Sequence, residues 1–153
     1  MVEANALPED ATSVDGMPLS PDEQRQRSEL LRLQREVGHA ALAERAAYTW
    51  FNRLVAIRFM ELHDYLPCRV RMLSADDGSF APQVLKCALD VQIEGLDASR
   101  VMELMQTGDD EALFRCLFLA QCDELSSCIP GVFDRVGSAM ELLLPDGLLR
   151  QDS

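Results

Sequence analysis

Lysine is almost missing from this 153-residue sequence, because thirteen of its fourteen basic residues are arginine and only Lys86 is lysine. Aromatic residues make up only 6%, so a hydrophobic core would have to be mainly aliphatic. The longest unbroken apolar run, Cys116–Ala120, is far shorter than the ~20 residues that cross a bilayer. The acidic N-terminus has no hydrophobic stretch of the kind found in secretory signals. These absences predict a cytoplasmic protein with no membrane partner.

The common motifs of catalysis are also absent. No two of the seven prolines are adjacent and no two glycines stand two positions apart, so neither an Asn-Pro-Pro-aromatic loop nor a Gly-x-Gly nucleotide loop can occur. Phosphate-loop, His-Glu-x-x-His and Gly-x-Ser-x-Gly motifs are missing as well. We therefore predict no catalytic residue, no cofactor-binding residue and no metal ligand in this chain.

The five cysteines form no recognisable metal or disulfide pattern. Their number is odd and no Cys-x-x-Cys occurs, which is typical of a reduced compartment. Cys116, Cys122 and Cys128 are six residues apart, so on a helix they would point to three different faces. Thiols on different faces cannot share one tetrahedral metal. We interpret these cysteines as small hydrophobic residues of the core.

What the sequence does contain is the composition of one globular domain, with 48% hydrophobic and 26% charged residues. The net charge of −12 is unevenly spread: residues 1–24 carry −6, residues 25–71 carry +4 and residues 72–153 carry −10. A protein this acidic is repelled on average by phosphate backbones. The middle segment could still present a local basic face.

Capping signals divide the chain into helices. Residues 1–19 have no apolar period and are expected to form a disordered leader, followed by a helical domain over residues 20–150. Ser20, Pro21 and Glu23 form a capping box that predicts a helix from Pro21 to Val37. Further helices are predicted over 40–63, 82–89, 97–106 and 109–127, with a last helical turn at 138–144. Short extended pieces are expected at 68–73 and 91–94 at most, so the class is all-α, a small irregular bundle of about five helices.

The predicted helix over 40–63 carries the broadest apolar arc. At 100° per residue, the apolar residues within about 60° of Leu54 are Ala43, Ala47, Trp50, Phe51 and Ile57, and the arc extends to Val55, Phe59 and Leu62. This arc predicts a central, largely buried helix with Trp50 and Phe51 as core anchors. Arg58 and Glu61 lie on the same arc, and two charges on a buried face must be paired. We predict either a buried ion pair or a docking contact between domains.

A basic face is a second candidate site. Arg45, Asn52 and Arg53 lie near the polar side of the helix over 40–63, and the helix before it adds more arginines. Together these side chains could touch DNA phosphates. The alternative is a solvated helix surface, in which arginines pair with acids three or four residues away, as Arg32 would with Glu36.

The segment Ala47–Glu61 closely resembles the N-terminal helical region of PglX-type adenine-specific DNA methyltransferases, which belong to the BREX and phage growth limitation systems. Leu117–Leu125 and Glu141–Leu149 resemble later parts of the same region, in the same order. The resemblance covers roughly residues 28–150.

The resemblance implies an enzyme that transfers a methyl group from S-adenosylmethionine to the N6 amine of adenine, after flipping the base out of the DNA duplex. In that family an Asn-Pro-Pro-Tyr loop holds the base and a glycine-rich loop holds the cofactor, and this sequence has neither. No catalytic residue therefore carries over, and we expect the chain to be inactive alone. Its expected partner is a catalytic methyltransferase region, in cis or in trans, with DNA contacted through that partner.

Other interpretations stay open at this stage. The chain could be a truncated or split product of such an enzyme, or a product that folds poorly. It could instead be a free-standing acidic helical module for protein interaction or regulation, in which the charge of −10 over residues 72–153 meets a basic partner.

Overall fold

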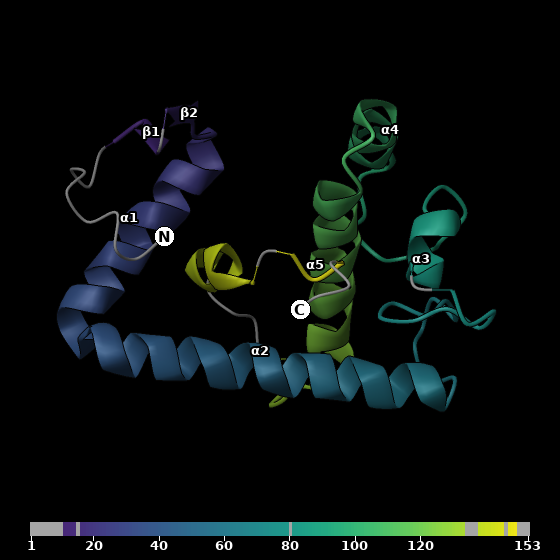
Figure 1. Ribbon diagram of the computed structural model, residues 1–153. Coiled ribbons are helices and arrows are strands. Elements are labelled where there is room, and N and C mark those ends of the chain that lie inside the picture. The colour runs from purple at the N-terminus through teal and green to yellow at the C-terminus, as the bar shows by residue number, and fades with distance from the viewer. Residues whose placement is uncertain (1–10, 15, 80, 134–137, 146, 150–153) are drawn as a thin grey trace. The chain divides into compact units, whose positions relative to one another are not determined.

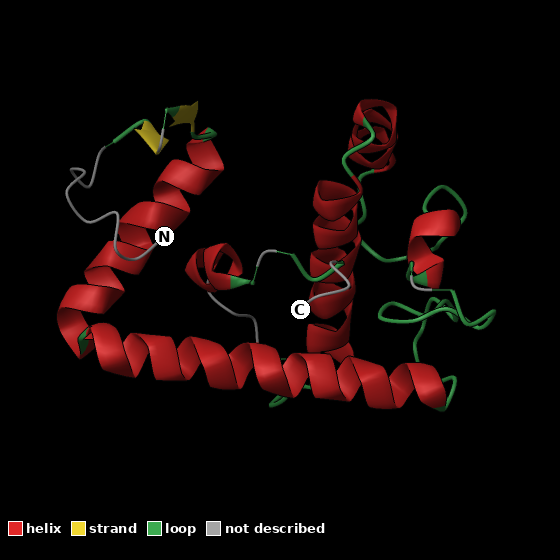
Figure 2. Ribbon diagram, viewed as in Figure 1, coloured by secondary structure: helices red, strands yellow, loops and turns green. Residues whose placement is uncertain are grey.

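The computed structural model describes residues 11–14, 16–79, 81–133, 138–145 and 147–149. Across these residues the fold consists of five α-helices, one 3-10 helix and a two-stranded ribbon, coloured by type in Figure 2. The all-α class predicted from the capping signals is therefore confirmed. The chain divides into two compact units, Met1–Trp50 with Val136–Leu144 and Phe51–Arg135 with Pro145–Ser153.

The first unit contains a short ribbon that the sequence did not predict. Strands β1 (Ser13–Val14) and β2 (Met17–Pro18) pair antiparallel, with Val14 opposite Met17. Gly16, at a φ of +78°, adopts the left-handed backbone that this turn requires. Residues 1–10 and 15 of the predicted leader lie outside the described residues.

Helix α1 (Pro21–Val37) has the bounds that its capping signals predicted. The hydroxyl of Ser20 accepts a hydrogen bond from the Glu23 amide at 3.2 Å, and the Glu23 carboxylate accepts one from the Ser20 amide at 2.8 Å. These reciprocal bonds satisfy two amides that a helix start leaves without partners. Gly38, at a φ of +85°, ends α1, and helix α2 (His39–Leu62) begins directly after it.

The core of the first unit is small and aliphatic. It comprises Leu30, Leu42, Ala46, Ala139 and Met140, with Leu33 and Leu143 packed against them. The 3-10 helix η1 (Ser138–Leu143) packs on α1, where Gln26 donates a hydrogen bond to the Glu141 carboxylate at 3.2 Å. Trp50 is 3% exposed and its indole nitrogen donates to the carbonyl of Met140 at 3.2 Å. Trp50 is thus the core anchor that the sequence predicted.

The second unit is organised around helix α5 (Asp110–Cys128). Helices α3 (Gln83–Lys86) and α4 (Ala98–Thr107) both pack against α5, as Figure 1 shows. Phe114 and Phe118 are buried on α5 with their rings stacked at 5.7 Å. The Glu111 carboxylate accepts hydrogen bonds from the amides of Gly147 and Leu148, at 2.8 and 3.1 Å, which ties the C-terminal segment to α5.

Aspartates fix the starts of α4 and α5, as their sequence positions predicted. The Asp97 carboxylate accepts from the Ser99 amide at 2.9 Å, and the Asp109 carboxylate accepts from the Ala112 amide at 2.9 Å. Among the residues that the structure describes, no helix combines the length and apolar character needed to cross a membrane.

The two short extended pieces that the sequence allowed are not strands. Over 68–73 the backbone bonds to α3 instead: the Arg71 carbonyl accepts from the Val84 amide at 3.0 Å, and the Arg71 amide donates to the side chain of Gln83 at 3.2 Å. Over 91–94 the chain turns, and the Val91 amide donates to the Cys87 carbonyl at 2.8 Å. Both segments satisfy their amides through turns and helix ends, so neither forms a ladder.

The predicted burial of α2 is wrong on one side. Phe51 was expected to be a core anchor but is 65% exposed. The other members of the predicted arc that the structure leaves exposed are Ala43, Ala47, Val55, Phe59 and Leu62. The residues buried along α2 are Leu42, Ala46, Trp50, Arg53, Ile57, Met60 and Glu61. Because α2 is apolar over much of its circumference, its sequence alone does not say which side packs.

The cysteines are free thiols with different environments. Cys122 is buried, as the core interpretation requires, and Cys116 is half-buried. Cys128 is exposed at the last residue of α5, so the core interpretation is wrong for this residue. A helix end lies too near solvent to bury a side chain without a covering segment.

Candidate functional site

Glu61 is the centre of a polar cluster in the second unit. Its side chain is fully buried and forms an ion pair with Arg58, which lies three residues earlier on α2 and is 47% exposed. The carboxylate also accepts hydrogen bonds from the Leu73 amide at 2.8 Å and from the Ser74 hydroxyl at 3.0 Å. Arg58 donates to the same Ser74 hydroxyl at 2.7 Å. The last turns of α2 are thereby joined to the loop at residues 73–74.

The chemistry of this cluster is structural. A buried carboxylate needs compensation by hydrogen bonds or an opposite charge, and Glu61 has both. The spacing of Arg58 and Glu61 predicted that they would pair, and the structure places them in contact. The pair lies at the edge of the unit, because one partner is fully buried and the other is half exposed. Its contacts lie within the second unit and fix the loop that follows α2.

The proposed phosphate-binding residues are not equally accessible. Arg45 and Asn52 are exposed, whereas Arg53 is 5% exposed on the buried side of α2. Arg53 therefore cannot contribute to an exposed basic face in this structure. The first-helix arginines show the alternative pattern, because Arg25 pairs with Asp22 at 2.6 Å and Arg32 with Glu36 at 3.9 Å. Such exposed pairs are typical of a solvated helix surface.

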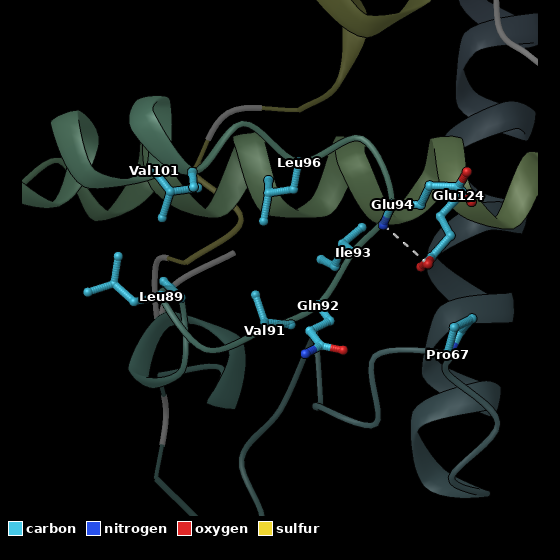
Figure 3. Close-up of a pocket in the computed structure, with 11 residues that line it drawn as sticks. Pro67, Leu89, Val91, Gln92, Ile93, Glu94, Leu96, Val101 and Glu124 are labelled. Atoms are coloured by element: carbon cyan, nitrogen blue, oxygen red, sulfur yellow. Dashed lines mark hydrogen bonds between the residues drawn. The ribbon is translucent and has the colours of Figure 1, made fainter.

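A pocket of about 530 Å³ lies in the second unit, among the turn at residues 88–96, α4 and α5. Figure 3 shows the aliphatic side chains of Leu89, Leu96 and Val101 at one end and the carboxylates of Glu94 and Glu124 at the other. Val91 and Ile93 also line the pocket. Gln92 and Glu94 line it too, so all four residues of the segment 91–94, which had suggested a strand, face one hollow.

The polar end of the pocket is already occupied by contacts within the chain. The Glu124 carboxylate accepts from the Glu94 amide at 3.3 Å and from the Gln121 side chain at 2.8 Å. The lining contains no cysteine, serine or histidine, and its groups with acid–base chemistry are the carboxylates of Glu94 and Glu124. The described residues also contain no group of three or more His, Cys, Asp or Glu side chains that could hold a metal ion.

The sequence reasoning missed an exposed apolar row on α2. We call Phe51, Val55, Phe59 and Leu62 the exposed row, and these side chains are 65%, 51%, 54% and 50% exposed. Their spacings of four, four and three residues place them on one face of the helix. The same spacing signalled the row in the sequence, but it was interpreted as part of the buried arc.

The exposed row continues into an aromatic group after the end of α2. The ring of His63 stacks on Phe59 at 4.2 Å and on Tyr65 at 5.6 Å. A nitrogen of His63 lies 2.8 Å from the Phe59 carbonyl, and because a carbonyl only accepts, that nitrogen carries the hydrogen. These contacts hold the rings in place although Tyr65 is 62% exposed.

Comparison with known proteins gives two relatives. No protein-family model matches the chain. It is 45% identical over 139 residues to the adenine-specific methyltransferase BrxX of Escherichia coli O9:H4 (strain HS), an alignment that covers 89% of this chain and 11% of BrxX. It is 34% identical over 110 residues to the adenine-specific methyltransferase PglX of Lacticaseibacillus casei (strain Zhang), covering 67% of this chain and 9% of PglX.

The chain thus spans about a tenth of the length of these curated relatives. An alignment covering 89% of the chain necessarily includes the whole of α2 and the Glu61 cluster. The chain is therefore a relative of the PglX-type adenine-specific methyltransferases and corresponds to one stretch of them, which confirms the resemblance found in its sequence.

Proposed function

We propose that this chain is a non-catalytic helical domain of a PglX-type adenine-specific DNA methyltransferase, equivalent to the N-terminal part of such an enzyme, and that it acts as a scaffold for the catalytic region. The observation that carries this proposal is the contrast in coverage. The alignment with BrxX takes in 89% of this chain but only 11% of BrxX. Most of such an enzyme therefore lies outside the stretch that this chain represents.

The residues of this chain support a scaffolding role. The polar cluster around Glu61 is used to hold the loop after α2. The sequence has neither the Asn-Pro-Pro-aromatic loop nor the glycine-rich loop of adenine methyltransferases. S-adenosylmethionine and the flipped adenine would accordingly be bound by the rest of the enzyme. The partner of this chain is that catalytic region, in cis or in trans, within a phage-defence system of the cytoplasm.

Segment replacement in BrxX tests this proposal. The stretch of the Escherichia coli BrxX gene that aligns with this chain would be deleted, or replaced by the 153-residue chain to give a chimera. N6-methyladenine in cellular DNA would then be measured by mass spectrometry of nucleosides. We expect the deletion to abolish methylation and the chimera to restore a substantial part of it, because the replaced stretch is 45% identical.

Two results would overturn the proposal. Full methylation by the deletion variant would show that this stretch is dispensable, which favours a free-standing interaction module. Transfer of a labelled methyl group to DNA by the purified 153-residue chain alone would show that the chain is itself catalytic.

A further inference from the structure

Within the second unit, α2 has a packed face and, opposite to it, an exposed apolar face. Relative to Phe51, the exposed row spans about 80° of the helix circumference, whereas Arg53, Ile57 and Met60 lie about 180–240° away. The second set is 0–8% exposed and the exposed row is 50–65% exposed. One face therefore supplies the packing of this unit, and the other has no cover within the residues that the structure describes. Exposed apolar surface of this kind marks interaction sites in soluble proteins.

Aromatic residues are concentrated at this uncovered face. The whole chain has nine aromatic residues, and Phe51, Phe59 and Tyr65 are three of those that the structure leaves more than half exposed. Large aromatic side chains dominate the energy of protein interfaces. The stack of Phe59, His63 and Tyr65 holds two of these rings in a fixed arrangement, which lowers the entropy cost of binding.

Few charged side chains lie beside the exposed row, and they are of both signs, because the exposed Asp64 lies between His63 and Tyr65. On the helix, Arg58 lies about 20° to one side of Phe51, and Asn52 lies about 100° to the other. Glu61 is the only acidic residue in Phe51–Leu62, and it is buried in its own contacts. A complementary surface is therefore mainly apolar. An apolar centre of this kind does not suit nucleic-acid phosphates.

The size of this face favours a partner domain over a second copy. Phe51, Val55, Phe59, Leu62 and Tyr65 together expose on the order of 500 Å². Contacts between domains of one polypeptide bury roughly 600–1,500 Å² in total, whereas stable interfaces between separate proteins bury about 1,600 Å². About 500 Å² on each side fits the first class. In BrxX, the aligned stretch is joined to the remaining 89% of the protein, which would hold a partner domain nearby at high effective concentration.

We propose that the exposed row on α2, with Tyr65, is the surface on which the remainder of the methyltransferase polypeptide docks, through an apolar groove. This inference rests on the proposed function. It deepens that function by assigning the contact to one face of one helix, and it places Arg58 at the rim of the contact as well as in the Glu61 cluster.

Cysteine labelling in the BrxX chimera tests this assignment. Val55→Cys places a small thiol in the middle of the exposed row, with Met102→Cys on α4 as the matched control, since Val55 and Met102 are both 51% exposed. Each variant would be made in the 153-residue chain alone and in the chimera. The rate of alkylation at each position would be followed by peptide mass spectrometry, and circular dichroism would verify that each variant is folded.

We expect the thiol at position 55 to react at least about tenfold more slowly in the chimera than in the isolated chain, because docking covers it. The thiol at position 102 should react at similar rates in both. Adding Phe51→Ser and Phe59→Ser to the Val55→Cys chimera should remove most of this protection. Because both phenylalanines are more than half exposed, their replacement should leave the fold of the chain intact.

Three results would overturn the inference. Equal labelling of position 55 in both contexts would show that the row stays uncovered. Protection in the isolated chain that grows with protein concentration would identify a second copy as the occupant. Protection that appears only after DNA is added would identify nucleic acid. The proposed function is judged separately by methylation in the unsubstituted chimera, so it can hold while this assignment fails.

Discussion

Glu61 shows how a single residue can connect distant parts of the second unit. Its buried carboxylate receives hydrogen bonds from α2 itself and from the loop twelve and thirteen residues later. The Leu73 amide, a backbone donor in a loop without regular structure, donates its hydrogen bond to this carboxylate. Arg58, by contrast, retains access to water through its exposed half.

This asymmetry predicts that Glu61→Ala destabilises the protein by about 2–3 kcal/mol, because it leaves several donors without an acceptor. The matched control is Glu103→Ala. Glu103 forms the same type of pair with Arg100, three residues earlier on α4, but with both side chains more than half exposed. We expect the control to leave the midpoint of urea unfolding nearly unchanged. Equal shifts for the two variants would contradict the structural role assigned to Glu61.

The cysteines allow a second prediction at the residue scale. Cys128 is exposed and Cys122 is buried, and burial raises the pKa of the half-buried Cys68 and Cys116 thiols. At neutral pH we therefore expect iodoacetamide to modify Cys128 first and Cys122 last, since alkylation requires an accessible thiolate. Peptide mass spectrometry over time gives the order. Early modification of Cys122 in the folded chain would contradict the packing of α5.

Among the helices, α1 has a start and an end that are both explained by residues next to it in the sequence. Its start is fixed by the reciprocal bonds of Ser20 and Glu23. We expect Ser20→Ala to lower the free energy of unfolding by about 1 kcal/mol, because the Glu23 amide loses its acceptor. Ser99→Ala, in the first turn of α4, is a suitable control, because Asp97 rather than Ser99 caps that helix. A urea titration of both variants measures the difference, and an unchanged midpoint for Ser20→Ala would refute the assigned cap.

The elements also show which parts of the fold the sequence could predict. Capping residues act within one turn, so Ser20, Asp97 and Asp109 marked helix starts that the structure confirms. The face that α2 buries is decided by residues far along the chain. Phe51 and Ile57 look alike in the sequence pattern, yet one is 65% exposed and the other fully buried.

The candidate site also has a part that the sequence could predict and a part that it could not. The positions of Arg58 and Glu61, three residues apart on one helix face, allowed their ion pair to be predicted as one of two alternatives. Their further partners, Leu73 and Ser74, belong to a loop without regular structure, where no periodicity indicates which amide will meet the carboxylate. Arg53 was placed near the polar side of the helix over 40–63 from its position in the sequence, but it lies on the packed side of α2.

At the scale of the whole molecule, the net charge is strongly negative, but the charge is unevenly distributed along the chain. Residues 72–153 carry −10, whereas residues 25–71, which contain most of α1 and all of α2, carry +4. The exposed row lies in the segment where the balance is positive.

The buried indole of Trp50 has a practical consequence for studying the two units. It is the only tryptophan in the chain, and it belongs to the first unit, where it donates to the Met140 carbonyl. Its fluorescence emission therefore reports the melting of that unit without a contribution from tryptophan in the other. Comparing this optical signal with far-ultraviolet circular dichroism, which averages over all helices, would reveal whether the two halves lose their structure in one cooperative step or in sequence.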